Sequence, residues 1–390
     1  MSRIWRTLTI PDPVRIRRCL SMPELGPKIL FFSGGSALNK ISRVLKSYTH
    51  NSIHFVTPFD SGGSSAKLRD EFSMPAVGDL RSRLMALADE SVLGQPDVYN
   101  LFHYRLDAKK TIEELRLELA QLKSGEHELI TKINQPLRQL IQTQLSITYN
   151  RISDHFDLRG ASIGNLIIAG GYLNNEQQLD PIVFLFSRLV KVLGEVKTIT
   201  DSCQHLVTTL ENDDVVFGQH HLTGKEVDPI NSPVKDIYLS DSLTSSERVS
   251  PSISDDRKAA ILGADLICYP PGSFYSSILA NLLPDGVAES ILANKNPKVY
   301  IPNLGVDPEQ YGMTLLSQVL KLICYVKGAD NENAKGALDF LLLDENIVYN
   351  DVYLTRIEAL GVTILRADLA SSDAIQYKEV KISEVLISLI

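Results

Sequence analysis

Three short segments rich in glycine and serine carry the residue types that could bind phosphate. The first is Gly34-Gly35-Ser36, which directly follows an apolar run, KILFFS, at residues 28–33. Two glycines let the backbone turn sharply and bring amide N–H groups close to an anion, and the start of a following helix adds favourable partial charge. The turn matches neither the full GxGxxG dinucleotide pattern nor the Walker lysine motif. Taken alone, it is compatible with a plain bend and with a phosphate site.

The second segment, PFDSGGSSAKLRDEF at residues 58–72, follows the next apolar run, SIHFVT. Asp60 could hold a metal ion or accept a proton. Glycines here permit a ligand to approach the backbone closely, and serine hydroxyls can donate to phosphate oxygens. The residues concerned are Gly62, Gly63, Ser64 and Ser65. The alternative is a capped loop in which Asp60 satisfies local amides.

The third segment, PPGSFYSSILANLLPDGV at residues 270–287, follows the apolar run ADLICY and places Gly272 and Ser273 at the expected start of a helix. Tyr275 could stack on a base or hydrogen-bond a sugar, or it could simply pack in the core. The strand end is therefore a third candidate for binding an anion.

Three further polar residues stand where a ligand would explain them. Asp79 has N-cap chemistry at the start of the helix after Gly78. Arg81 would lie in the first turn of that helix, where a cation is disfavoured unless it serves an anion. Asn165 is the polar residue in an otherwise apolar segment, SIGNLIIAG, and needs a backbone or ligand partner if buried.

The elements that must position these segments alternate between strands and helices. Apolar runs predict strands at 28–33, 52–57, 264–269, 298–303 and 362–365. Periodic segments between them predict helices, for example at 37–45, 80–88, 275–283 and 315–326 and from 382 onward. This rhythm predicts an α/β, Rossmann-like, doubly wound and mainly parallel sheet in three layers. In such a sheet the glycine-rich loops share the carboxyl edge and form one cleft.

The chain is interpreted as a basic N-terminal extension, residues 1–26, followed by a single domain, 27–390. A helical insert is expected at about 107–150, because leucine and isoleucine recur there at spacings of three and four. Its apolar face would contact either the body of the domain or a second copy in a homo-oligomer. A β-hairpin excursion is expected at 206–220, and a surface connection rich in serine, proline and aspartate at 227–256, within a region spanning about 204–256.

Composition narrows the function classes. The chain has 390 residues, 44% of them hydrophobic, and a formal net charge of −8, which disfavours nucleic acid as the main partner despite five arginines among the first 18 residues. No apolar stretch reaches membrane-spanning length. Four scattered cysteines indicate reduced thiols in the cytoplasm. The histidines lack the spacing of a zinc site.

Six ordered segments together resemble the CofD family, which includes the 2-phospho-L-lactate transferase of coenzyme F420 biosynthesis and the gluconeogenesis-factor proteins. The gluconeogenesis-factor branch is the more similar. Its motifs GGGTG, DDGGSSGRLR, GDIR, LFxYRF, GNLLLAAL and GPGSLYTSIIPNLLVPGI are similar, in that order, to residues 33–37, 59–69, 78–81, 101–106, 164–172 and 270–287. The resemblance extends from about residue 28 to the end.

The resemblance implies a Rossmann-like three-layer fold with a nucleotide diphosphate ligand at the strand ends. It implies that Gly34, Gly35 and Ser36 cradle phosphate, with Asp60 nearest the chemistry and able to bind Mg²⁺. It also implies that Ser64, Ser65, Gly272, Ser273 and Tyr275 line the nucleotide site. The transferase branch moves lactyl phosphate from a guanosine diphosphate ester to a deazaflavin hydroxyl, releasing GMP with magnesium assistance. The other branch is associated with UDP-sugar binding, carbon metabolism and cell shape.

The sequence departs from the family pattern at three places. Phe59-Asp60 stands where the pattern has paired aspartates, Ala37 replaces the last glycine of the first turn, and residues 159–161 replace a Gly-His pair. Two functions therefore stay open: a transferase acting on a nucleotide diphosphate ester, and a nucleotide-sugar-binding regulator without turnover. A third, a nucleic-acid or membrane-surface protein acting through the arginine-rich start, is disfavoured by the acidic remainder of the chain.

Overall fold

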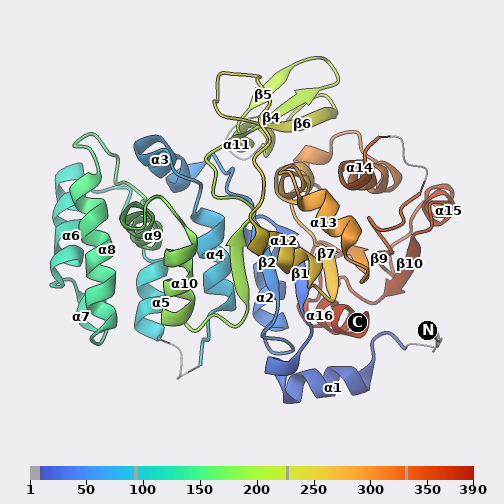
Figure 1. Ribbon diagram of the computed structural model, residues 1–390, viewed down its shortest axis with the longest axis horizontal. Coiled ribbons are helices and arrows are strands. Elements are labelled where there is room, and N and C mark those ends of the chain that lie inside the picture. The colour runs from blue at the N-terminus through green and yellow to red at the C-terminus, as the bar shows by residue number, and fades with distance from the viewer. Residues whose placement is uncertain (1–8, 92–94, 225–227, 330–332) are drawn as a thin grey trace.

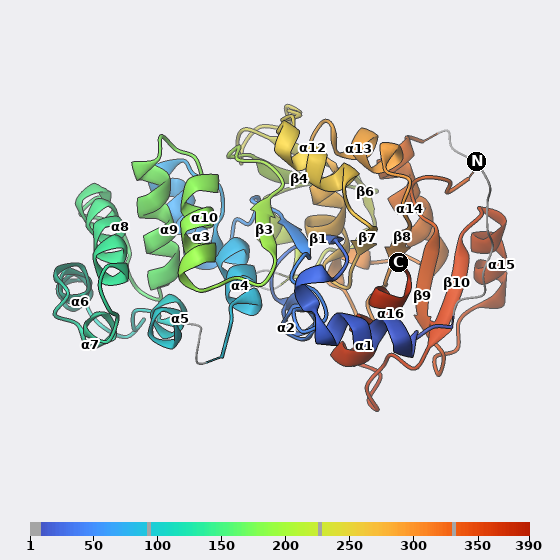
Figure 2. The same cartoon turned by 60° about the horizontal axis from the view of Figure 1, so that its bottom comes forward.

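The computed structural model describes residues 9–91, 95–224, 228–329 and 333–390. A seven-stranded parallel sheet runs through the molecule in the order β10-β9-β8-β7-β1-β2-β3 (Figures 1 and 2). The strands are β1 (Ile29–Ser33), β2 (Ile53–Val56), β3 (Glu195–Thr198), β7 (Leu266–Tyr269), β8 (Lys298–Tyr300), β9 (Phe340–Asp344) and β10 (Thr363–Ala367). The predicted α/β fold with a mainly parallel sheet is confirmed. Strands β3 and β9 were not predicted from the sequence.

Alternating side chains of the central strands bury both faces of the sheet. Leu30 and Phe32 pack into one core, beneath helices α12 (Asp255–Leu262), α13 (Val287–Ala293), α14 (Leu315–Lys327) and α15 (Asp351–Ala359). Ile29 and Phe31 pack into the opposite core, against α1 (Pro13–Ser21), α2 (Asn39–Leu45) and α16 (Glu379–Ser388). The sequence of a strand buried on both faces is a nearly continuous apolar run. This is why KILFFS clearly predicts β1.

Part of the predicted N-terminal extension is helical. Asp12 caps α1 by accepting from the amides of Val14 and Arg15, and its own amide donates to the Ser388 hydroxyl at 2.7 Å. Helix α1 therefore lies against α16 at the far end of the chain, as Figure 2 shows. Arg3 and Arg6 lie outside the described residues.

A lobe of helices stands beyond the β3 edge of the sheet, at the left of Figure 1, and has its own hydrophobic core. It comprises α3 (Gly63–Phe72), α4 (Gly78–Leu87), α5 (Pro96–His103), α6 (Ile112–Ser124), α7 (Glu128–Thr131), α8 (Leu137–Arg151), α9 (Ile163–Asn174) and α10 (Asp180–Leu189). The expected insert corresponds to α6 to α8, whose buried side chains Leu119 and Leu145 pack in this core. Its apolar face thus contacts the body of the same chain.

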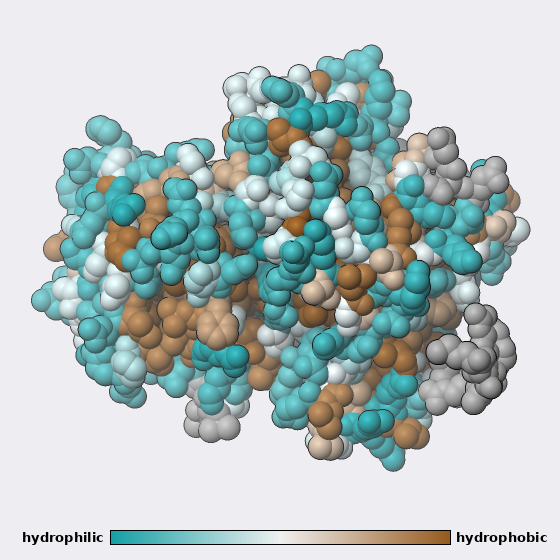
Figure 3. Space-filling model, viewed as in Figure 1, coloured by the Kyte–Doolittle hydropathy of each residue, from teal (hydrophilic) through white to brown (hydrophobic). Residues whose placement is uncertain are grey.

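Hydrophobic side chains also gather on the surface of this lobe, in the face that Figure 3 shows. Phe184 on α10 is 62% exposed, and the guanidinium of Arg188 lies 5.1 Å from the centre of its ring. The rest of this face is mostly hydrophilic. None of the described helices is long and apolar enough to cross a membrane, and all four cysteines are free thiols.

A second, antiparallel sheet stands above the carboxyl edge, at the top of Figure 1. The predicted hairpin is confirmed as β4 (His205–Leu210) and β5 (Val215–Phe217). The expected surface connection at 227–256 was wrong in part, because it contains β6 (Val234–Ser240), which pairs with β4. Ile237 and Leu239 are buried there. The surrounding serine, proline and aspartate concealed this short strand in the sequence.

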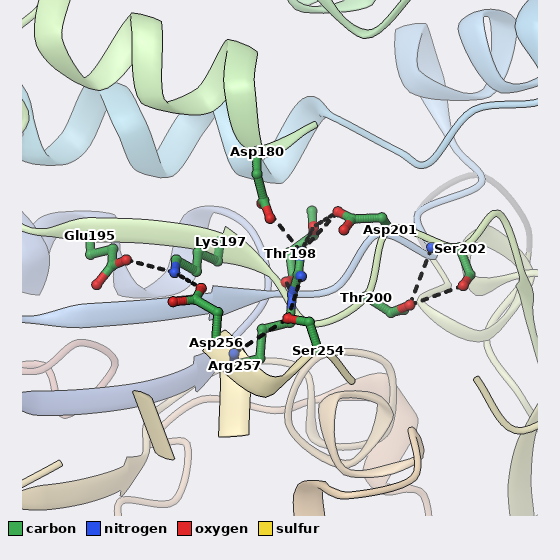
Figure 4. Close-up of polar contacts among 10 residues, drawn as sticks. All are labelled: Asp180, Glu195, Lys197, Thr198, Thr200, Asp201, Ser202, Ser254, Asp256 and Arg257. Carbon is green, nitrogen blue, oxygen red and sulfur yellow. Dashed lines mark hydrogen bonds and ion pairs between the residues drawn. The ribbon is translucent and has the colours of Figure 1, made fainter. Parts of the chain in front are cut away.

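Arg257 joins three elements at the β3 edge of the main sheet (Figure 4). This side chain on α12 is buried and donates to the Thr198 carbonyl of β3 at 2.7 Å. It also donates to the carboxylate of Asp201 at 2.8 Å and to that of Asp180, on α10, at 3.3 Å. Beside it, Lys197 pairs with Glu195 and Asp256. The network therefore ties the helical lobe to the sheet.

Replacing Arg257 by alanine is expected to lower the free energy of unfolding by about 3 kcal/mol, because it leaves partly buried carboxylates and a buried carbonyl without their donor. Urea unfolding followed by circular dichroism measures the change. The matched control is Arg248→Ala, because Arg248 is 61% exposed where it pairs with Asp236, and its loss should cost less than about 1 kcal/mol. Equal losses for the two variants would contradict this account.

Candidate functional site

A cleft of about 390 Å³ opens at the carboxyl ends of β1, β2 and β7. It is lined by the turn after β1, the loop after β2, the start of α4 and the loop after β7, with Asn165 of α9 and residues of α11 (Gln219–Leu222) closing it. The structure brings together these predicted site residues: Gly34, Gly35, Ser36, Asp60, Gly62, Gly63, Ser64, Ser65, Asp79, Arg81, Asn165, Gly272 and Ser273. Tyr275 lies outside it.

The turn after β1 directs its amide groups into the cleft. Arg83, buried behind the turn, donates to the carbonyl oxygens of Gly34 and Gly35, each at 3.0 Å. Because C=O and N–H point in opposite directions across a planar trans peptide, the amides of Gly35 and Ser36 face away from Arg83. Neither amide donates to a backbone carbonyl among the described residues. These donors are therefore available to an anion.

Both glycines of the turn allow neighbouring side chains to approach the backbone closely. A Cβ on Gly34 would lie 2.1 Å from the Ser277 hydroxyl, and one on Gly35 would lie 2.4 Å from a carboxylate oxygen of Asp79. Burial lowers the pKa of Arg83 to about 9, so its guanidinium still carries a charge at neutral pH. The turn is thus fixed from behind by a buried cation.

The loop after β2 contributes the N-terminus of α3 and the Ser64 hydroxyl to the cleft. Helix α3 begins after Gly62 without a side-chain cap. The Ser64 hydroxyl accepts from Asn165 at 3.0 Å and from Arg105 at 3.5 Å, which leaves its own hydrogen to donate. Both features suit a phosphate oxygen.

Ser65 joins the second loop to α4. Its hydroxyl accepts from the Gly78 amide at 3.1 Å, and a Cβ on Gly78 would lie only 2.5 Å away. The expected N-cap role of Asp79 was wrong, because α4 begins at Gly78 after Val77 and Asp79 lies within the first turn. Its carboxylate instead lies beside Gly35, where it shapes the cleft.

Arg81 is buried in the cleft wall. One guanidinium nitrogen donates to the Phe102 carbonyl at 2.9 Å, while its Nε is buried with no partner among the described residues. Burial and the neighbouring Arg105 lower the pKa of Arg81 to about 10. Gly164 makes room for it, because a Cβ there would lie 2.6 Å from the arginine Cδ. Two arginines facing one cleft favour an anionic ligand.

The loop after β7 differs from the expected anion site. Its amides are already satisfied by side chains of the segment after β8: Asn303 accepts from Gly272, Asp307 from Phe274, and Glu309 from both Tyr275 and Ser276. Those amides are therefore not free for phosphate. The predicted helix at 275–283 is a π-helical turn, Phe274–Ile278, followed by a 3₁₀ turn, Leu279–Leu282.

Tyr275 is buried away from the cleft, which corrects its predicted role in lining the nucleotide site. Its ring packs edge-on against Phe274, and its hydroxyl donates to the Val234 carbonyl of β6 at 3.4 Å. Burial raises the pKa of this tyrosine above its ordinary value. The residue thus links the small sheet to the main core.

Several lining residues escaped sequence reasoning because they come from α11, below the small sheet. Gln219, His220 and Thr223 line the cleft. The Ser61 hydroxyl lies 2.7 Å from His220 Nδ1 and 3.3 Å from the same residue's amide, so this contact fixes α11 to the second loop. The only local signal in the sequence was the adjacent pair His220 and His221, and the spacing of the histidines had indicated no zinc site.

Two buried amide oxygens face the cleft without a donor from the described residues. They belong to Asn165 and Gln219, each less than 10% exposed. A buried carbonyl oxygen without a hydrogen bond is costly. Both oxygens therefore suit hydroxyl or amide donors on a ligand.

The carboxylates of Asp60 and Asp79 are the metal-binding candidates of the cleft. Mg²⁺ in phosphoryl-transfer sites is commonly held by one or two carboxylates together with substrate phosphates. The described residues contain no cluster of three or more potential ligands, so a metal here would depend on the phosphates. The donor set fits Mg²⁺ on these terms.

Arg69 anchors the backbone before Asp60 and depends on a neutral histidine. It donates to the carbonyls of Pro58 and Asp60, at 3.0 and 3.2 Å, and to His205 Nδ1 at 3.1 Å. Burial and the arginine charge lower the pKa of His205 to about 4. Protonating His205 would place a second cation against Arg69.

This contact predicts acid sensitivity. His205 has an ordinary pKa near 6.5 when unfolded, so between about pH 6.5 and 4 the unfolded chain binds the additional proton and the stability that His205 contributes is lost as pH falls. Urea unfolding at pH 7 and pH 5 should show a smaller loss for His205→Gln, which keeps an acceptor, than for the wild type. The same loss in both proteins would exclude this role.

Comparisons with known proteins show what this chain is similar to. Residues 29–385 match the family model described as 2-phospho-L-lactate transferase CofD. The gluconeogenesis factor of Bacillus subtilis is 25% identical over 380 residues, covering 93% of this chain and 98% of that protein. The gluconeogenesis factor of Listeria monocytogenes is 29% identical over 283 residues, covering 72% and 68%. A crystal structure of a UPF0052-family protein from Bacillus halodurans has a TM-score of 0.67 at 23% identity, covering 93% and 99%.

Proposed function

This chain belongs to the CofD family, and we propose that its cleft binds a nucleotide diphosphate ester and transfers a phosphate-containing group from it to an acceptor hydroxyl. The observation that carries the proposal is the convergence of backbone amides with two arginines and two carboxylates. Amides and arginines suit phosphate, whereas carboxylates in a phosphate site oppose an anion unless they bind a metal or take part in proton transfer.

The residues of the chain divide the work of such a transfer. The amides of Gly35 and Ser36, the Ser64 hydroxyl and Arg81 neutralise the phosphates and orient the reacting phosphorus. Asp60 accepts the proton of the attacking hydroxyl. The oxygen–phosphorus bond to the acceptor forms as the bond to the nucleoside monophosphate breaks, and the monophosphate leaves with the bonding electrons.

Magnesium would be held by Asp60 and Asp79 together with phosphate oxygens, where it would supply charge neutralisation of the diphosphate. Asp79 is already close to the first turn, so it would meet the phosphates that the turn binds. Asn165 and Gln219 would accept hydrogen bonds from hydroxyl groups of the transferred group or the acceptor.

Turnover is tested with the substrates of 2-phospho-L-lactate transferase, the activity in the description of the family model. The full chain is incubated with lactyl-diphosphoguanosine, a deazaflavin and Mg²⁺, and GMP is quantified by chromatography. The proposal expects GMP above a no-protein blank, with loss of the product when EDTA is added. Absence of GMP while the same protein binds guanosine nucleotides would reject this transfer and leave the binding site intact.

A second candidate function is a regulator that binds a nucleotide sugar without turnover, affecting carbon metabolism or cell shape. It is favoured by Phe59, which is fully buried and removes one of the paired carboxylates of the family pattern, and by the gluconeogenesis-factor names of the relatives. Calorimetry with UDP-sugars and guanosine nucleotides distinguishes the candidates. Saturable UDP-sugar binding without conversion would support the regulator.

A further inference from the structure

A second compartment of about 440 Å³ adjoins the cleft. The two share a rim made of Ser36, Ala37, Pro271, Gly272 and Ser273. Beyond this rim the walls come from α2, from the segment after β8 and from the chain leading into the start of α16. Their apolar members include Ile41, Leu304, Val306 and Ile375, and their charged members are Lys40, Asp307 and Glu379. Helices α2 and α16 pack together on one face of the sheet, as Figure 2 shows, so the compartment opens on that side of the carboxyl edge.

Apart from Pro271, the rim consists of residues with small side chains. A Cβ on Gly272 would meet only Ala37 among the described residues, at 3.9 Å, which is ordinary contact. The glycine does not adopt a left-handed φ, so the fold itself does not require it. This differs from Gly34 and Gly35, where added atoms would collide. The space above Ala37 and Gly272 therefore forms a passage between the cleft and the compartment.

The floor of the passage is held in place by the segment after β8. Asn303 exchanges two hydrogen bonds with the Gly272 backbone, at 2.8 and 2.7 Å. The Tyr377 hydroxyl donates to the Pro302 carbonyl at 2.6 Å, which joins that segment to the chain before α16. A site held in this way loses little conformational entropy when a ligand binds.

We propose that the compartment holds the nucleoside of the ligand while the cleft holds its phosphates. This inference rests on the proposed function. Neither Asp60 nor Asp79 lines the compartment, so the group it takes is the end that does not react. Apolar walls suit the faces of a base and ribose, and the exposed amide of Gln376, which accepts from Lys40 at 2.6 Å, offers polar atoms to a base edge.

The ligand would then cross the carboxyl edge of the sheet between two neighbouring strands, β1 and β7. Open parallel sheets commonly bind ligands in a crevice at this edge. The arrangement also separates recognition from chemistry. Contacts with the nucleoside contribute binding free energy on one side of the rim, and the phosphates meet the charged groups on the other.

Calorimetry on the full chain tests the inference with inorganic pyrophosphate, GDP and UDP. The wild type should bind at least one nucleotide more tightly than pyrophosphate. Ile375→Asn should reduce that nucleotide preference by about tenfold, because an apolar wall becomes polar. Ile375 is 63% exposed, so folding should be unaffected, and the matched control is Val352→Asn on α15, which is 65% exposed and should keep the preference.

A second variant narrows the passage itself. Gly272→Leu should reduce the preference for nucleotide over pyrophosphate at least as much as Ile375→Asn does. A wild-type protein that binds pyrophosphate and nucleotides equally, or variants that both retain the full preference, would overturn the nucleoside assignment alone. A wild type that binds neither pyrophosphate nor any nucleotide would overturn the proposed function as well.

Discussion

Replacing Asp60 by asparagine is expected to lower the turnover of the proposed transfer by about a thousandfold, the range of a lost general base. The carboxylate lies in the cleft and accepts from the Gly62 amide at 3.1 Å, so asparagine keeps the size and one acceptor while losing the charge. Nucleotide affinity without Mg²⁺ should be retained or improved, because a negative charge beside the phosphates is removed. Initial rates of GMP release and calorimetry measure the two effects.

The matched control is Asp70→Asn. Asp70 lies on α3, the helix that follows Asp60, but outside the cleft. It should keep the wild-type rate. If Asp60→Asn retains the wild-type rate while GMP formation is robust, Asp60 neither accepts the proton nor holds the metal, and the division of roles in the cleft would be wrong.

Replacing Arg81 by methionine is expected to weaken the binding of a nucleoside diphosphate by about 100-fold, because a buried guanidinium facing the phosphates is lost. Its Nε is buried without a described partner, and the neighbouring Arg105 already disfavours its charge in the free protein. An incoming diphosphate would relieve that repulsion. Calorimetry with GDP and UDP measures the change.

Arg81→Lys should recover part of the affinity, since it restores the charge without the planar donors. Arg151→Met, on the exposed end of α8, is the control and should bind as the wild type does. The Arg81 variant must first be shown to unfold at a similar urea concentration, because its guanidinium also donates to the Phe102 carbonyl. A folded Arg81→Met protein with wild-type affinity would remove Arg81 from the site.

The sequence predicted most of the cleft because its loops have local signals. Gly34, Gly62 and Gly272 each follow an apolar run that becomes a parallel strand, and parallel strands place such loops at one edge. The prediction therefore needed no distant contact. Asn165 was also recognised locally, as a polar residue in a run that had to be buried.

What the sequence did not reveal depends on distant partners. Glu309 lies more than thirty residues after Ser276, yet its carboxylate accepts a hydrogen bond from the Ser276 amide. The expected anion site is therefore a structural contact. His220 reaches the cleft only because the small sheet stands above the carboxyl edge. The role of Arg83 behind the first turn was likewise invisible, since periodicity indicates that a residue is helical but not which carbonyls it contacts.

Calorimetric titration of the full chain with GDP, UDP and pyrophosphate tests the central claim most directly, namely that the cleft built on Gly34, Gly35 and Ser36 binds a diphosphate. The account predicts saturable binding of one diphosphate per chain, weakened by Arg81→Met. Absence of binding by all three compounds at millimolar concentration, in a protein shown to be folded, would contradict it.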